Sequence, residues 1–281
     1  MVSLGAAPAF LARAAASSRA INGPGRPLLV VIFQRGAADG LNMVVPHAEG
    51  PYYDLRPGIA IARPGMTDGA LDLDGTFGLH PRLQPLQPLW NNGSLAVVHA
   101  CGSHDPTRSH FDAQDFMESA APGDRSIRDG WLNRYLQVGL IADPLRGVAV
   151  TSTMPRALAG TGAALSMASI EQFDLLGGAH GPGVAQLKRA YLGATDSEFQ
   201  EAALAAFEAM DELGAITNDR YEPTGGAEYP DSPFGQALQD IAQLAKAEVG
   251  LEVAFAETSN WDHHVNEGGA EGQLANRLDE L

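Results

Sequence analysis

Histidines are concentrated between residues 99 and 110, where three of the eight histidines in the chain stand among Ser, Thr, Asp and Arg side chains. A serine or threonine hydroxyl becomes a nucleophile when a nearby base or metal ion activates it, so Ser109 or Thr107 could attack an ester. Arg108 could hold the anionic oxygens of the same ester group. Ser109 is equally suited to capping a following helix, and the two roles are compatible because a helix N-terminus also stabilises anions.

Two further polar clusters carry residue types that bind divalent cations. Asp39 offers a hard oxygen donor within a run of small residues, 34–42, where the backbone can approach a ligand closely. Asp262 and His264 stand two residues apart, and imidazole nitrogen is a donor that zinc favours. The alternatives are an ordinary turn at Asp39-Gly40 and a solvated polar pair at Asp262 and His264.

Each of the three clusters follows a segment that the sequence predicts to be a buried strand. These segments are residues 28–33, 95–98 and 251–256, and another strand is predicted at 147–151. The unbroken apolar run at 28–33 indicates burial on both faces, as in a parallel sheet. Ligands of open α/β sheets bind just beyond the carboxyl ends of the strands, so the placement of the clusters is the main functional signal.

Helical patterns alternate with these strands. Residues 81–90 have apolar side chains at helical spacing and, with the strands at 28–33 and 95–98, predict a βαβ crossover. A capping-box pattern at 195–198 precedes a second helix, and Pro233 begins a third with Phe234, Leu238, Ile241 and Ala245 along one face. This alternation predicts a three-layer α/β/α sandwich with a mostly parallel sheet, formed by a single domain over residues 23–281.

The composition limits the classes of partner. Thirty-four acidic residues against 18 basic ones give a formal charge of −16, which argues against non-specific nucleic-acid binding. The same negative charge repels an anionic substrate, unless a metal or a local basic patch makes the electrostatic potential at the site positive. The single cysteine, Cys101, excludes an internal disulfide, and we expect no membrane span.

The N-terminal residues differ from the rest of the chain. Residues 1–20 are Ala-rich and precede the first acidic residue, Asp39. They resemble the end of an export signal, so residues 1–22 are interpreted as a signal remnant or, alternatively, as a disordered or helical arm.

Six short segments follow one another along residues 28–272 in a characteristic order. They are Phe33–Leu41, Leu79–Pro81 with Leu86 and Trp90, Gly93–Val98, Ser109–Gln114, Gly130–Leu136 and Trp261–His264. Together these segments resemble the DUF1501 family of exported bacterial proteins, although none is specific alone. The family is often exported by the twin-arginine route, which supports the signal interpretation.

The chain also resembles the alkaline phosphatase- and sulfatase-like superfamily, whose members use two divalent metals and a Ser, Thr or formylglycine nucleophile to cleave phosphate or sulfate esters. By position, the resemblance implies Asp39, Asp262 and His264 as metal ligands and Ser109 as the nucleophile, in one loop with Arg108. The spacing of Asp262 and His264 is narrower than is usual in that superfamily. The implied cofactor is a divalent metal, namely zinc, manganese or calcium.

The resemblance implies a further C-terminal segment, like Ser-Glu-Phe-Gly-Arg and then Gly-Thr-Asp-His-Gly, with a second Asp-His ligand pair. The chain ends at Leu281 inside an expected helix that carries Leu274 and Leu278. We therefore expect a C-terminally incomplete alkaline phosphatase-like domain, with poor solubility or oligomerisation from an uncovered strand edge or helix face.

These observations favour a metal-dependent hydrolase of phosphate or sulfate esters, with a small-molecule or polysaccharide substrate, in the periplasm or secreted. The alternative is a non-catalytic exported protein that keeps the fold to bind a polymer, a partner or a single metal ion. A redox enzyme ranks third, because the sequence has no dinucleotide-binding fingerprint.

Overall fold

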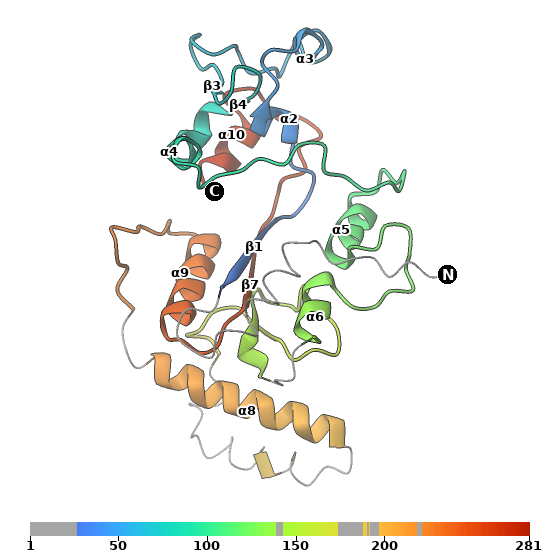
Figure 1. The fold of residues 1–281 in the computed structure, drawn as a ribbon, viewed down its shortest axis with the longest axis vertical. Helices are drawn as coiled ribbons and strands as arrows, with labels where there is room; N and C mark the ends of the chain where they lie inside the picture. Colours follow the sequence, from blue (N-terminus) through green and yellow to red (C-terminus); the bar gives the residue numbers. More distant parts are fainter. Residues whose placement is uncertain (1–26, 139–142, 174–187, 190, 192–196, 218–220) are drawn as a thin grey trace. The chain divides into compact units, whose positions relative to one another are not determined.

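The computed structural model describes residues 27–281 except 139–142, 174–187, 190, 192–196 and 218–220 (Figure 1). The interpretation of residues 1–22 as a signal remnant or arm lies outside the described residues. The chain divides into two compact units, one of Met1–Phe33 and Asp115–Glu257 and the other of Gln34–Gln114 and Thr258–Leu281. The division does not test independent folding, so the single domain at 23–281 stays a prediction.

The first unit contains a four-stranded sheet in the order β1-β7-β5-β6. Its strands are β1 (Leu29–Gln34), β5 (Gly147–Val150), β6 (Leu165–Met167) and β7 (Val253–Thr258). β5 is parallel to both of its neighbours, and Ala149 lies opposite Ser166 of β6 and Phe255 of β7. The mostly parallel sheet and the strands predicted near 28–33, 147–151 and 251–256 are confirmed.

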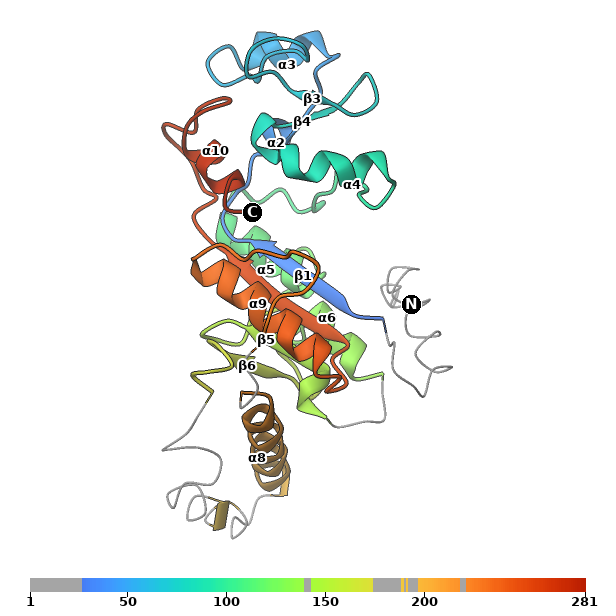
Figure 2. The same ribbon diagram turned by 90° about the vertical axis from the view of Figure 1, so that its left-hand side faces the viewer.

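Helices cover both faces of this sheet. α8 (Ser197–Thr217) and α9 (Pro233–Lys246) pack on the face that carries Val148 and Ala254. α6 (Trp131–Leu136) packs on the opposite face, with Ala149 and Phe255. Figures 1 and 2 show α9 running along the sheet. The alternation of side chains between two apolar layers gives this unit three layers.

α9 forms as its sequence predicts. The Ser232 hydroxyl accepts a hydrogen bond from the Gly235 amide at 3.0 Å and caps the helix, and Pro233 occupies the first turn. Proline suits this position because the first turn has no intrahelical partner for its missing N–H. The buried face carries Phe234, Ala237, Ile241 and Leu244, whereas Ala245 is exposed. The capping box at 195–198 lies partly outside the described residues, and α8 begins within it, at Ser197.

Two expectations for the first strands are wrong. β1 is not buried on both faces, since Val30 and Ile32 are 40% and 43% exposed. β1 ends the strand order and therefore has β7 as its one neighbour among the described strands. Residues 95–98 form no strand, and Val98 is 75% exposed. The Leu95 amide bonds instead to the Leu89 carbonyl at 3.0 Å, so the predicted βαβ crossover is absent from this segment.

The second unit has a small antiparallel sheet in the order β2-β4-β3. Its strands are β2 (Val44–Val45), β3 (Leu71–Asp72) and β4 (Gly78–Leu79). The same unit contains short helices: α2 (Gly40–Met43), α3 (Gly50–Leu55), α4 (Gln87–Asn91), α10 (Gln273–Leu278), the 3-10 helix η1 (Pro81–Leu86) and the start of α5 (His110–Ser119). The C-terminal helix is confirmed as α10.

The helix predicted over residues 81–90 is present in two parts. Leu83 leaves helical geometry (φ −88°, ψ 17°) inside η1, and α4 begins after it with Pro88 in its first turn. Pro85 and Pro88 lack the N–H that a continuous helix needs for its i to i−4 hydrogen bonds, which accounts for the division.

Trp261 is the largest fully buried side chain among the described residues and anchors the core of the second unit. It packs with Leu79, Leu83, Leu274 and Leu278. The segment that carries Asp262 therefore starts from a fixed point.

Of the helices that the structure describes, none combines the length and the apolar character needed to cross a membrane. Oligomerisation stays a prediction.

Candidate metal centre

Three side chains of the second unit bring metal-ligating atoms together. His110, Asp262 and His264 each offer one ligand atom, and these atoms lie within 4.8 Å of one another. Asp262 Oδ1 is 3.4 Å from His110 Nε2 and 3.1 Å from His264 Nε2. The two imidazole rings lie 5.4 Å apart between centroids. The arrangement holds two nitrogen donors around one carboxylate oxygen.

His110 is positioned by the start of α5. The Ser109 hydroxyl accepts from the Asp112 amide at 3.3 Å, and the Ser109 carbonyl accepts from the Ala113 amide at 2.9 Å. The Thr107 hydroxyl in turn accepts from the Ser109 amide at 3.2 Å. Ser109 thus caps the helix, as one of the two interpretations of this residue predicted, and places His110 in the first turn.

Asp262 is positioned by the chain that leaves β7. The Arg35 amide donates to the Thr258 carbonyl at 2.8 Å, and the Trp261 amide donates to the Arg35 carbonyl at 3.3 Å. Gly36, at φ +135°, lies so close that a Cβ there would stand 2.7 Å from the Asp262 nitrogen. The residues after β1 and β7 therefore run in close backbone contact up to the first ligand.

The group is open to solvent. The side chains of His110, Asp262 and His264 are 36%, 38% and 76% exposed. Two imidazoles and one carboxylate form a donor set that suits zinc, and three protein ligands leave a further coordination position open. Calcium prefers six to eight oxygen ligands, so this set does not suit it. The residues fit a borderline cation such as zinc.

Asp39 lies outside this three-residue group and is engaged elsewhere in the second unit. It caps α2, accepting a hydrogen bond from the Leu41 amide at 3.1 Å, and its carboxylate pairs with the Arg56 guanidinium. Burial, and then the neighbouring Asp39 carboxyl group, raises the pKa of Glu267 to about 7. The ligand role of Asp39 stays a prediction.

The remaining predicted residues lie around His110. Ser109 is its chain neighbour and partly buried, and Arg108 is exposed. His110 was singled out by its cluster but not assigned as a ligand, because the sequence does not show which histidine of the cluster approaches Asp262. His99 stacks instead on Phe77, with ring centroids 3.9 Å apart.

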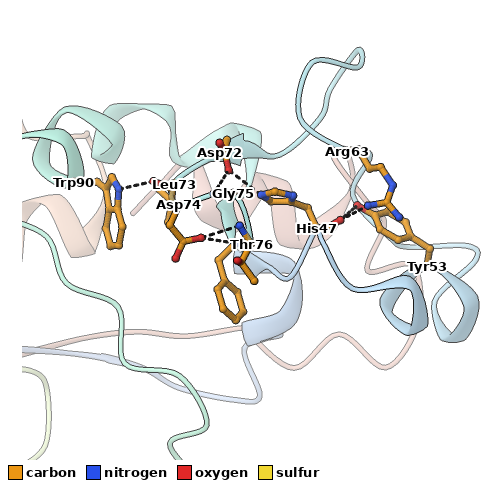
Figure 3. A network of polar contacts seen from close by, with 10 residues as sticks. His47, Tyr53, Arg63, Asp72, Leu73, Asp74, Gly75, Thr76 and Trp90 are labelled. Atoms are coloured by element: carbon orange, nitrogen blue, oxygen red, sulfur yellow. Dashed lines mark hydrogen bonds and ion pairs between the residues drawn. The ribbon is translucent and has the colours of Figure 1, made fainter.

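A second polar network in this unit involves the β3–β4 turn (Figure 3). Asp72 Oδ1 accepts from His47 Nε2 and from the Gly75 amide, each at 2.9 Å. Asp74 accepts from the Thr76 and Phe77 amides, and these bonds lower its pKa. The two carboxylates contact backbone amides of the turn and, through Asp72, the side chain of His47, so the network accounts for the shape of the turn.

The comparisons with known proteins are consistent with the motif resemblance. The profile described as "Protein of unknown function (DUF1501)" matches residues 26–280, nearly the whole chain. No curated protein and no solved structure matches the chain. The likeness to the alkaline phosphatase- and sulfatase-like superfamily therefore has no support from these comparisons and is kept for the proposal below. The chain belongs to the DUF1501 family.

Proposed function

We propose that this protein is a metal-dependent hydrolase of phosphate or sulfate esters, with one divalent cation held by His110, Asp262 and His264. The observation that carries the proposal is the convergence of these three ligand atoms within 4.8 Å. A cation bound there would polarise the ester and offset the negative charge that develops on the transferring group. The donor set favours zinc, with manganese as the next candidate.

The neighbouring residues support ester chemistry. Ser109 directly precedes the ligand His110, so its hydroxyl lies at the N-terminus of a ten-residue helix. That helix end favours negative charge, and Arg108 is exposed and able to contact anionic oxygens. Because the chain carries a formal charge of −16, an anionic substrate needs this local positive potential. The proposal includes a small-molecule or polysaccharide ester as substrate, and action in the periplasm or outside the cell.

The first experiment measures the metal content of purified protein by elemental mass spectrometry, after reconstitution with zinc or manganese. We expect one equivalent in the wild type and loss of the metal in His110→Ala and Asp262→Ala. His99→Ala is the matched control, because His99 belongs to the same cluster but stacks on Phe77. A wild type without metal would refute the proposed site.

Asp39→Ala tests whether the cation needs the carboxylate implied by the family resemblance. We expect this variant to keep its metal, since Asp39 pairs with Arg56. Loss of metal in a folded Asp39→Ala protein would show that Asp39 contributes to the same centre.

The metal-loaded protein is then assayed against aryl and alkyl phosphates and sulfates. Ser109→Asn retains a side chain that caps helices but lacks the hydroxyl, whereas Ser109→Ala lacks both. Loss of hydrolysis in both variants would support Ser109 as the nucleophile. Hydrolysis that survives in Ser109→Asn would leave Ser109 with the capping role alone.

The second candidate is a non-catalytic protein that binds a single metal ion. The ion pair of Asp39 with Arg56 favours this candidate. Asp39 is the carboxylate expected to bind metal in a two-metal site, and here it contacts Arg56 instead. Stoichiometric metal without hydrolysis of any ester in the panel would select this candidate.

A further inference from the structure

Arg35 is hydrogen-bonded to both segments that carry the candidate ligands. Its backbone carbonyl accepts from the Trp261 amide at 3.3 Å, and its backbone amide donates to the Thr258 carbonyl at 2.8 Å. Its guanidinium Nη1 donates to Gln114 Oε1 at 3.3 Å. The backbone of one residue thus holds the chain leading to Asp262, while its side chain reaches α5.

Gln114 continues this connection to His110. Its amide Nε2 donates to the carbonyl of His110, one helical turn earlier, at 3.1 Å. The two ends of the Gln114 amide therefore serve different partners, the oxygen facing Arg35 and the nitrogen facing the first turn of α5. The hydrogen bonds run without interruption from Trp261 through Arg35 and Gln114 to His110.

We propose that Arg35 and Gln114 are positioning residues that set the separation between His110 and the pair Asp262 and His264. The inference rests on the proposed metal site and assigns no contact with the cation to either residue. A metal centre needs its ligands within about 0.5 Å of the productive geometry. The carboxylate that bridges the imidazoles is itself more than a third exposed, so it is poorly suited to fix the ligands alone.

The proposal predicts an effect on coordination geometry as well as on affinity. Removing residues that orient metal ligands typically weakens metal binding by about 10–100-fold. Gln114→Ala breaks the connection at its centre and leaves all three ligands in the chain. Gln114→Glu keeps an oxygen for Arg35 but loses the Nε2 donor to the His110 carbonyl, so it should also weaken metal binding.

Cobalt(II) is the probe, because its visible absorption reports the number and arrangement of its ligands. Titrations of the full chain compare wild type, Gln114→Ala, Arg35→Ala, the double variant and Gln84→Ala, an exposed glutamine in η1 of the same unit. In both single variants we expect the cobalt dissociation constant to rise by about 10–100-fold and the absorption spectrum to change. The double variant should bind cobalt about as tightly as either single variant, because both substitutions break the same connection. Gln84→Ala should match wild type.

The outcomes separate this inference from the proposed function. A wild type that binds no cobalt overturns both. A wild type that binds cobalt, with unchanged affinity and spectrum in Gln114→Ala, overturns the positioning role alone. If Gln114→Ala does not fold, Arg35→Lys decides, since it keeps the backbone bonds and the charge. Arg35→Lys should weaken cobalt binding and alter the spectrum. An Arg35→Lys titration that matches that of the wild type would refute the inference.

Discussion

Gly36→Ala is expected to disturb the candidate centre without touching a ligand. Gly36 has φ +135°, and a Cβ at this position would lie 2.7 Å from the Asp262 nitrogen. Ordinary van der Waals contact begins at 3.4 Å, so one of the two backbones must move by 3.4 − 2.7 = 0.7 Å. That displacement exceeds the tolerance of about 0.5 Å for a preorganised site.

The same substitution should cost stability. A non-glycine residue held in such a backbone conformation costs about 1–3 kcal/mol. The backbone of Trp261, 3.0 Å from the added Cβ, cannot yield easily because its side chain is fully buried. We therefore expect the free energy of unfolding to fall by about 1–3 kcal/mol and the metal affinity to fall by about 10-fold or more.

Urea unfolding and zinc titration measure the two effects. Gly40→Ala is the matched control, because nothing lies within 4 Å of its added Cβ and its φ is not in the positive region. It should leave metal binding unchanged and alter stability by at most about 1 kcal/mol. A Gly36→Ala protein with wild-type stability and wild-type zinc affinity would refute this account of the backbone contact.

Two further predictions concern ionisable groups. Glu252→Ala leaves Arg146 buried without the carboxylate that it contacts at 3.0 Å, so urea unfolding should show a loss of about 3–5 kcal/mol. A loss below about 1 kcal/mol, the value of a surface pair, would contradict the burial of this pair. The pKa of Glu267, raised to about 7 from 4.5, means that the folded protein retains a proton that the unfolded chain releases above pH 4.5. This contribution to stability is complete below pH 4.5 and lost as pH rises through about 7, and Glu267→Gln should remove that dependence in urea midpoints taken between pH 4 and 8. An unchanged pH dependence in the variant would exclude Glu267 as its source.

Local sequence predicted the elements whose stabilising interactions lie within a few residues. Pro233 predicted the start of α9, and the Ser232 cap beside it acts within the same turn. The apolar runs at 147–151 and 251–256 predicted β5 and β7 to within two residues. Such patterns are sufficient where capping and periodic burial coincide.

The sequence could not predict which strands find partners. Residues 95–98 are as apolar as β7, yet they form no strand, because a strand also needs neighbours for its backbone groups. For the same reason the pattern of β1 did not reveal that it ends the described sheet and exposes Val30 and Ile32.

For the candidate site, the sequence by itself determined the residue types and their local placement: a histidine after a capping serine, and an aspartate two residues before a histidine. The tertiary structure decided which of them meet. His110 joins Asp262 and His264, whereas Asp39 pairs with Arg56. Such meetings depend on backbone contacts between distant segments, such as that of Gly36 with Trp261 and Asp262. A linear pattern of residues carries no direct record of contacts at that separation, because they arise only when the strands pair and the core around Trp261 closes.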